Sequence, residues 1–268
     1  MTEIGPQLLG RIPSPPDERD YHLAAFLSGD PLDAALEVLQ SSRAVAAATK
    51  TWAAAVTPYL KQIVVPAPPA PPPSPVPSDV LWADVEDVLD QGNYGTCVGN
   101  GWAQWGNTDP VDDRYAEVDA RAIYYEATVF DGQPDNPDEP GGGQQGSTVR
   151  SGAKAMKKRG RLAAYAFASS VDEVRAFLAT QGPVVIGIDW TNSMFTPDAA
   201  GFIAPTDAVA GGHCLVIVGD SIADDAAVLL NSWGASWGIK GSAKLKWSDF
   251  ATLLGQGGEA CAAVELPQ

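Results

Sequence analysis

The chain has 268 residues, and 45% of them are hydrophobic, which is enough for a substantial core in one large or two modest domains. Lys and Arg total 17 against 33 Asp and Glu, and the resulting net charge of −16 argues against nucleic acid or an anionic membrane as the main partner. The three cysteines, Cys97, Cys214 and Cys261, are widely spaced and form no CxxC. This argues against a disulfide framework and a structural zinc site, although the sequence leaves one disulfide pair open.

The first 21 residues contain no basic start followed by an apolar stretch, and no run in the chain has the length and hydrophobicity of a membrane span. The sequence therefore predicts no secretory signal and no membrane partner. We expect a protein that is cytoplasmic or packaged in a larger particle such as a virion.

An N-terminal helical extension is predicted within residues 1–64. Asp30-Pro31 is typical of a helix cap followed by a first-turn proline, and Leu32, Leu36 and Leu39 follow at helical spacing. The alanine-rich stretch 42–57 also favours a helix, which Pro58 would kink or restart.

A proline-rich linker follows at residues 65–78. Eight of the twelve residues from Pro66 to Pro77 are proline, which favours a stiff polyproline II spacer. At about 3.1 Å per residue, these twelve would reach roughly 37 Å. The linker separates the extension from the rest of the chain, residues 79–268.

Beyond the linker, helical patterns come first and strand patterns later. We expect helices at 97–105, 120–130, 147–159 and 171–181, the first of them tolerating its glycines if it is buried. Apolar runs predict strands at 183–190, 213–219, 226–233, 242–247 and 259–266. This order indicates an α+β fold with two lobes: a helical lobe at 79–165 and a strand-rich lobe at 166–268.

Cys97 is a candidate nucleophile. It stands at a predicted helix start and follows Gly92, Gly95 and Thr96, and the glycines allow the backbone to turn sharply beside the sulfur. A helix N-terminus and a neighbouring imidazolium both favour the thiolate. The alternative is a buried structural cysteine.

His213 is the candidate base. The chain has only two histidines, and the other, His22, has no partner motif. Gly211 and Gly212 precede His213 and a strand follows it, which predicts an imidazole at a strand entrance with open space in front. The alternative is a histidine that only completes a strand end.

The sequence 231–241, NSWGASWGIKG, supplies the third candidate. The amide oxygen of Asn231 can accept a hydrogen bond from an imidazole N–H and orient the ring, and Trp233 can cover that bond from water. The alternative is a structural turn with packed indoles.

Three segments resemble the papain family of cysteine peptidases. NSWGxxWGxxG resembles the family segment that carries its active-site asparagine, and GGHCLVIVGD resembles its histidine strand. QGxxGxC, from Gln91 to Cys97, resembles its oxyanion glutamine and nucleophile. The order also fits, with histidine 116 residues after the cysteine and asparagine 18 residues further on.

The chain departs from much of the family in two places. Val98 replaces the aromatic residue that often follows the nucleophile, and Tyr94 replaces a cysteine that often forms a disulfide. With Ile123-Tyr124-Tyr125 and the turn at 146–150, the pattern is similar to bacterial and phage members.

The resemblance implies a two-lobed peptidase that needs no cofactor and no metal. It implies that Cys97, His213 and Asn231 act as a triad through a thioester acyl-enzyme, with Gln91 at the oxyanion. It also implies a substrate groove near Gly211, Gly212, Cys214 and Trp233. Because Gly211, Gly212 and Cys214 around the base are small and uncharged, we expect the enzyme to accept many side chains, or to prefer apolar ones, near the cleavage point.

Other interpretations stay open. The acidic stretch 131–139 is a solvated loop or a calcium site, although it lacks the alternating ligand spacing of an EF-hand loop. Residues 1–64 are a pro-region that blocks the groove, an anchor to a partner, or a passive tail; residues 10–21 resemble a segment that bacterial members carry ahead of the catalytic part. An assembly protein of a larger particle, built on a peptidase fold, is the alternative function. A cell-wall peptide as substrate would leave the mechanism unchanged.

Overall fold

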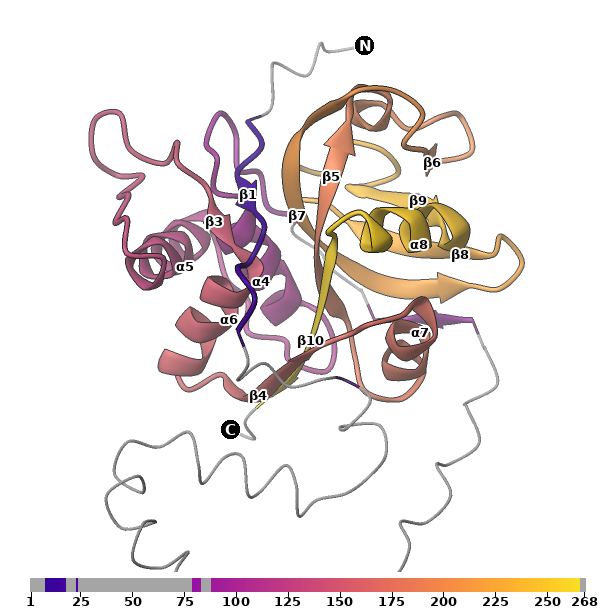
Figure 1. Cartoon of the computed structure of the whole chain (residues 1–268), viewed down its shortest axis with the longest axis horizontal. Coiled ribbons are helices and arrows are strands. Elements are labelled where there is room, and N and C mark those ends of the chain that lie inside the picture. Colours follow the sequence, from indigo (N-terminus) through magenta and orange to yellow (C-terminus); the bar gives the residue numbers. More distant parts are fainter. Residues whose placement is uncertain (1–7, 18–22, 24–78, 83–87, 266–268) are drawn as a thin grey trace, which may run out of the picture.

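The structure is a computed structural model that describes residues 8–17, 23, 79–82 and 88–265. The helical extension predicted around residues 30–64 and the linker at 65–78 lie outside the described residues. The described chain forms helices on one side and a twisted sheet with further helices on the other, so the predicted α+β fold is confirmed (Figure 1).

The four helices predicted from sequence are present within a few residues of their expected bounds: α4 (Cys97–Asn107), α5 (Glu117–Phe130), α6 (Val149–Lys158) and α7 (Val171–Thr180). Two further pieces, α8 (Trp247–Gly255) and the 3₁₀ turn η1 (Asn192–Phe195), were not predicted. In the described ranges, no helix combines the length and the apolar composition that crossing a membrane requires.

The glycines of α4 are explained by close helix packing. A Cβ on Gly99 would come within 2.2 Å of the Ala120 carbonyl oxygen in α5. In the neighbouring helix α6, a Cβ on Gly152 would come within 2.2 Å of the Trp102 ring of α4. Glycine costs helix stability but lets the two backbones approach. This is why α4 is helical and buried despite its composition.

An eight-stranded sheet forms the other part of the described chain. Seven of its strands follow one another in the order β4-β10-β5-β7-β8-β9-β6, and β2 (Val80–Leu81) pairs with β7. Their bounds are β4 (Leu162–Phe167), β5 (Val184–Thr191), β6 (Phe202–Ile203), β7 (Val209–Ser221), β8 (Ala226–Leu230), β9 (Ser242–Lys246) and β10 (Glu259–Glu265). Strands β2, β4 and β6 were not predicted, and β4 spans the expected lobe boundary at 165/166.

Alternate residues of the central strands pack into two hydrophobic clusters, one on each face of the sheet. In β7, Leu215 and Ile217 join the cluster that includes α7 and α8 residues, whereas Cys214 and Val216 join the cluster with α4 and α6. Because both faces are covered, these strands are apolar runs rather than alternating ones. The sheet thus holds the helical side and the strand side together.

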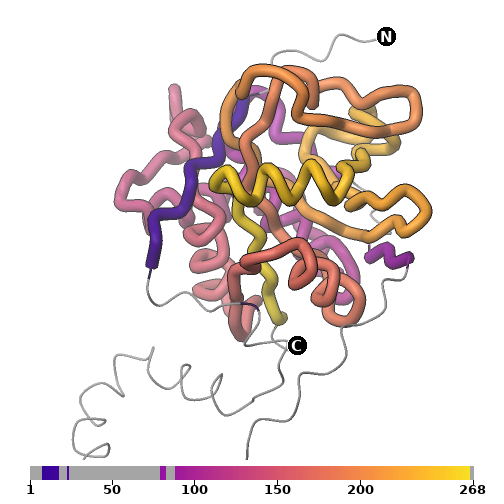
Figure 2. Tube along the Cα trace, turned by 45° about the vertical axis from the view of Figure 1, so that its right-hand side comes forward, coloured from indigo at the N-terminus to yellow at the C-terminus, as the bar shows by residue number. Residues whose placement is uncertain are grey.

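A short N-terminal segment, residues 8–17, lies between these two sides. Its strand β1 (Arg11–Ile12) pairs in parallel with β3 (Ser147–Thr148), and Ser147 donates its backbone N–H to the Gly10 carbonyl at 2.7 Å. In Figures 1 and 2 the indigo segment runs between the helices α4 to α6 and the strands β5 and β7.

Candidate active site

Cys97 is the first residue of α4, and its side chain is fully buried. Thr96 precedes it as the N-cap, and the Asn100 side-chain amide donates to both the carbonyl and the hydroxyl of Thr96 at 3.0 Å. The turn before the sulfur is therefore fixed from inside the helix. The positive end of the helix dipole faces the sulfur, as expected for a reactive cysteine.

His213 and Asn231 are joined by a hydrogen bond of 2.8 Å between Nε2 and Oδ1. The same Asn231 oxygen accepts the backbone N–H of Ser232 at 2.8 Å, and a backbone N–H can only donate, so the atom must be the amide oxygen. Nε2 of His213 therefore carries the proton. The neutral ring keeps its lone pair on Nδ1, which has no hydrogen-bond partner among the described residues.

Strand β7 brings His213 near Cys97. The backbone amide of Cys214, the residue after His213, lies close enough to the Cys97 thiol to lower its pKa. Gln104 of α4 also donates to the Asn231 carbonyl at 3.0 Å, which ties the loop after β8 to the helix that carries Cys97. Three elements that are remote in sequence are thus fixed to one another.

Aromatic rings cover the His213–Asn231 hydrogen bond. Trp233 stacks on the imidazole with centroids 4.7 Å apart, and Trp190 approaches its edge at 4.9 Å. Phe195 stacks on Trp233 in turn, at 5.4 Å. This predicted role of Trp233 as a cover is consistent with its 2% exposure, and a water-excluded bond is stronger than an exposed one.

Gln91 is oriented so that its amide nitrogen can serve as a donor. Its Oε1 accepts from the Ser232 hydroxyl at 2.8 Å, which leaves Nε2 to donate to the Tyr94 carbonyl at 2.8 Å and to the Leu8 carbonyl at 2.9 Å. Leu8 belongs to the N-terminal segment. A backbone carbonyl of the segment therefore occupies the Gln91 donor.

The segment also covers the sulfur. The backbone amide of Gly10 lies close enough to the Cys97 thiol to lower its pKa, and a Cβ on Gly10 would lie only 1.8 Å from the Gly95 carbonyl oxygen. On the other wall, a Cβ on Gly212 would meet the Arg11 carbonyl at 2.2 Å. Only a strand without a side chain at position 10 fits at this point of the groove.

Burial sets the charge states of Cys97 and His213. Burial raises the pKa of the Cys97 thiol to about 11, against a smaller lowering by the backbone amides of Cys214, Gly10 and Val98. Burial also lowers the pKa of His213 to about 4, although the Asn231 hydrogen bond favours the cation. Near neutral pH the covered site therefore holds a neutral thiol and a neutral imidazole.

The structure places the residues expected to line the groove in two environments. Gly211 faces Leu9 of the segment, Gly212 faces Arg11, and Trp233 lies behind the imidazole. The Cys214 side chain instead belongs to the helix-side core, where a Cβ on Gly101 would meet its sulfur at 2.8 Å. Cys97, Cys214 and Cys261 form no disulfide bond.

Sequence reasoning missed the contact between Arg11 and Glu259. Arg11 Nη2 donates to Glu259 Oε2 at 2.7 Å and to the Gly257 carbonyl at 2.8 Å, and its side chain is fully buried. The residues are 248 positions apart, so no local pattern links them. A basic residue within an otherwise proline-rich and apolar start, RIPSPP, was the one available signal.

The acidic stretch 131–139 is built into the fold as a structural loop. Asp135 is buried and accepts the Tyr124 hydroxyl together with the backbone amides of Gly143, Gln144 and Gln145. The loop supports β3, on which the N-terminal segment lies. In the described part of the chain, no group of His, Cys, Asp or Glu is arranged to hold a metal.

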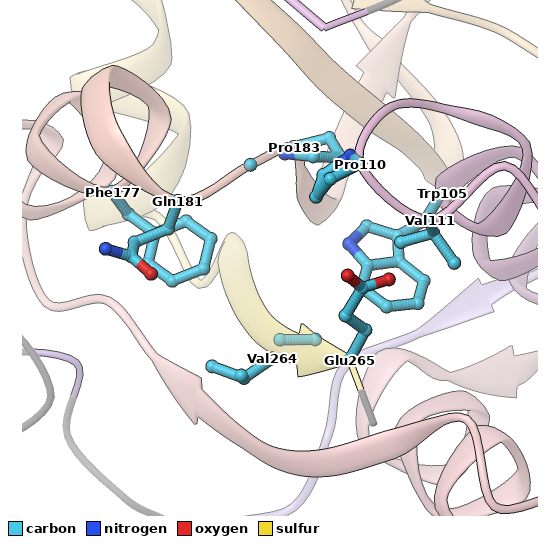
Figure 3. A pocket seen from close by; sticks show the side chains of 10 residues that line it. Trp105, Pro110, Val111, Phe177, Gln181, Pro183, Val264 and Glu265 are labelled. Carbon is cyan, nitrogen blue, oxygen red and sulfur yellow. The ribbon is translucent and has the colours of Figure 1, made fainter. Parts of the chain in front are cut away.

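A pocket of about 150 Å³ lies elsewhere, between the ends of α4 and α7 and strand β10 (Figure 3). Trp105, Pro110, Phe177 and Glu265 are among its walls. None of the four candidate catalytic residues lines it. The pocket in Figure 3 therefore lies apart from the candidate site at Cys97, where the N-terminal segment is bound.

The family model described as papain family cysteine protease matches residues 125–252. The match includes His213 and Asn231, whereas Cys97 and Gln91 lie ahead of it. No curated protein matches the sequence.

Among solved structures, xylellain, a cysteine protease from Xylella fastidiosa, is similar with a TM-score of 0.62 and 15% identity, covering 100% of this chain and 99% of its own. A structure concerned with the mite allergens Blo t 1 and Der p 1 has a TM-score of 0.51 and 18% identity, covering 78% of this chain and 77% of its own. At these identities the likeness establishes a shared fold.

Proposed function

We propose that the chain hydrolyses peptide bonds with Cys97 as nucleophile, His213 as base, Asn231 as the residue that orients the base, and Gln91 as an oxyanion donor. The match of residues 125–252 to the papain family cysteine protease model supports this proposal. The observation that carries this proposal is the hydrogen bond from His213 to Asn231, which leaves the Nδ1 lone pair without a partner among the described residues. A general base needs a free acceptor atom beside the nucleophile.

The proposed chemistry follows from these atoms. Nδ1 of His213 takes the proton of Cys97, and the thiolate attacks the substrate carbonyl. The backbone N–H of Cys97 and Nε2 of Gln91 hold the developing oxyanion. His213 then gives its proton to the leaving amine, and water hydrolyses the thioester. No step calls for a metal or an organic cofactor.

The described state is not ready for catalysis, since Leu8, Gly10 and Arg11 occupy the groove. The carbonyl of Leu8 takes the Gln91 donor, and Gly10 covers the sulfur. Of the three roles open for residues 1–64, these contacts favour blocking. We therefore propose that residues 8–17 hold the enzyme latent and must leave before substrate can enter.

The test of the oxyanion role is Gln91→Ala, measured as kcat/KM on a small peptide amide. Loss of one donor is expected to lower kcat by about 10² to 10³ with a smaller change in KM, because the hydrogen bond strengthens in the transition state. Gln133→Ala, which removes an exposed glutamine side chain on the loop after α5, is the control and is expected to leave kcat unchanged. A Gln91→Ala enzyme with unchanged kcat would contradict the assignment.

Thiol labelling tests latency without needing turnover. With a pKa of about 11, roughly one Cys97 thiol in 10⁴ is ionised at pH 7, and it is also covered. We expect slow iodoacetamide labelling of Cys97 in the full chain and at least about tenfold faster labelling when Gly10→Val displaces the segment. Cys214 and Cys261 are buried in cores and serve as internal controls, read by mass mapping. Faster labelling of Cys214 than of Cys97 would contradict the assignment.

A further inference from the structure

The pocket in Figure 3 contains a buried hydrogen-bond donor, the indole N–H of Trp105. The Trp105 side chain is 1% exposed, and its Nε1 makes no hydrogen bond to any of the described residues. In Figure 3 this nitrogen lies on the edge of the ring that faces the pocket. A buried N–H without an acceptor costs free energy, so a ligand that brings an oxygen to this point would be stabilised by the new hydrogen bond.

The other walls of the pocket are mostly apolar. They include Pro110, Phe177 of α7 and Pro183, the residue before β5. Glu265 at the end of β10 adds a carboxylate, and the chain as a whole has a net charge of −16. Because these charges repel an anion, the acceptor that suits Trp105 is a neutral one, such as a peptide carbonyl, carried by an apolar body.

A proline-rich segment has both of these properties. Polyproline II forms no internal hydrogen bonds, so its carbonyls are available, and its prolyl rings supply apolar surface. Aromatic-lined grooves recognise such segments, whose preformed helix loses little conformational entropy on binding. This chain contains one, because eight of the twelve residues from Pro66 to Pro77 are proline and none of the twelve is charged.

The chain leaves this proline-rich linker beside the pocket. The Trp82 indole donates to the Leu178 carbonyl in α7 at 2.8 Å, and the Trp82 carbonyl accepts the Asp109 N–H at 3.0 Å. Leu178 and Asp109 are each the direct sequence neighbour of a residue that lines the pocket. Pro77 is five residues ahead of Trp82, which is at most about 18 Å of extended chain. The linker therefore reaches the pocket from its own C-terminal end.

The N-terminal flank of the same stretch is also fixed on this side of the molecule. Leu23 is fully buried in the hydrophobic cluster that contains Phe177 and other α7 residues. A segment tethered to the protein meets the pocket at an effective concentration on the order of 1 mM. A contact too weak to hold a free peptide at micromolar concentration is therefore sufficient for the linker.

We propose that this pocket binds a proline-rich segment through Trp105, and that its occupant is the linker of the same chain, residues 65–78. The indole N–H donates to a linker carbonyl, and prolyl rings pack on the apolar walls. Trp105 is eight residues from Cys97 in α4, which places the two about 12 Å apart along the helix axis. Docking here thus holds the N-terminal extension on the enzyme after residues 8–17 have left the groove, and the inference does not depend on peptidase activity.

The experiment follows the Trp105 indole N–H by NMR in the full chain labelled with ¹⁵N-tryptophan, with its signal assigned from the loss in Trp105→Phe. In a variant with Ser at all eight linker prolines, the signal is expected to move and its exchange with solvent to become about 2- to 10-fold faster. This range corresponds to a linker docked in about half to nine-tenths of the molecules. Pro31→Ser, outside the linker, is the control and is expected to change neither quantity. The other indole signals report whether the fold is intact.

A peptide titration tests the pocket from the other side. A synthetic peptide of residues 65–78, added to the variant with Ser at the linker prolines, is expected to bind with a Kd of about 1 mM or tighter and to return the Trp105 signal to its original position. Val264→Lys, at a pocket residue that is 36% exposed, is expected to abolish this binding. Val118→Lys, at an exposed position of α5 outside the pocket, is the matched control and is expected to preserve it.

The outcomes distinguish the linker from other occupants. An exchange rate of Trp105 that the loss of the linker prolines leaves unchanged overturns the linker as occupant, and a change on deletion of residues 266–268 instead would assign the pocket to them. A signal that moves on dilution of the full chain assigns the pocket to the linker of a second copy. A Trp105 signal that responds neither to the loss of the linker prolines nor to the added peptide overturns the proposal as a whole.

Discussion

Replacing Cys97 by Ala is expected to reduce hydrolysis of a small peptide amide to the background rate, a loss on the order of 10⁴-fold or more, and His213→Ala is expected to do the same. The reason is that the two residues act as a unit: without Nδ1 of His213 the thiol stays protonated, and without Cys97 the base has no nucleophile to activate. The double variant should therefore be no less active than either single one. The measurement is kcat/KM in the full chain with and without Gly10→Val.

Two further substitutions make this result specific. Asn231→Ala is expected to cost less than His213→Ala, since it removes the group that holds the tautomer and leaves the proton carrier in place. Cys261→Ala, in the core of β10, is the control for loss of a thiol and is expected to retain activity. Activity that survived Cys97→Ala but disappeared with Cys261→Ala or Cys214→Ala would overturn the assignment of the nucleophile. Full activity of Asn231→Ala would indicate a dyad.

The parts of the site that were predictable from sequence are those with a local pattern. Gln91 and Cys97 lie on one turn before a helix, and His213 begins the apolar part of a long strand. Asn231 follows a strand end and is flanked by the Trp-Gly pairs that pack over it. At each of these positions, the residue type and the turn or strand that carries it are visible in the neighbouring sequence, and the catalytic role stays a prediction.

The elements that were missed have weak or long-range signals. Helix α8 packs through Trp247, Phe250 and Leu253, a helical spacing that is short and follows β9 without a break. Strand β4 is alanine-rich, and it is a strand because β10 pairs with it along its length. Tertiary pairing of this kind overrides the local preference of alanine for helices.

The docking of residues 8–17 has the same character. Its contacts join Gly10 to Gly95 and Arg11 to Glu259, positions that are remote in sequence. Sequence showed only that residues 10–21 resemble a segment of bacterial relatives. The proposal that this segment blocks the groove rests on what lies beneath Gly10, which no local pattern shows.

Gly10→Val is expected to raise turnover of a small peptide amide by the full chain on the order of 10- to 100-fold, because it releases the segment from the groove. A Cβ at this position would lie 1.8 Å from the Gly95 carbonyl oxygen, and that atom is backbone, so the wall cannot yield cheaply. On the other side, the Gly10 carbonyl is held by the Ser147 amide at 2.7 Å, and moving the strand away from Gly95 strains that bond. The closed state is therefore destabilised, while the groove itself is unchanged.

The size of the gain follows from the fraction of open enzyme. If the groove is free of the segment in about 1% to 10% of the molecules, complete release raises the observed kcat/KM by the reciprocal of that fraction. Further weakening of the closed state then adds nothing. Ile12→Ala changes a side chain of the same strand that is 43% exposed and is the matched control, expected to leave turnover nearly unchanged. Thermal unfolding of each variant separates release from misfolding. A Gly10→Val chain that stays folded, with neither faster turnover nor faster Cys97 labelling, would show that residues 8–17 do not limit access to the groove; because release acts by freeing both the sulfur and the Gln91 donor, the two readouts must rise together.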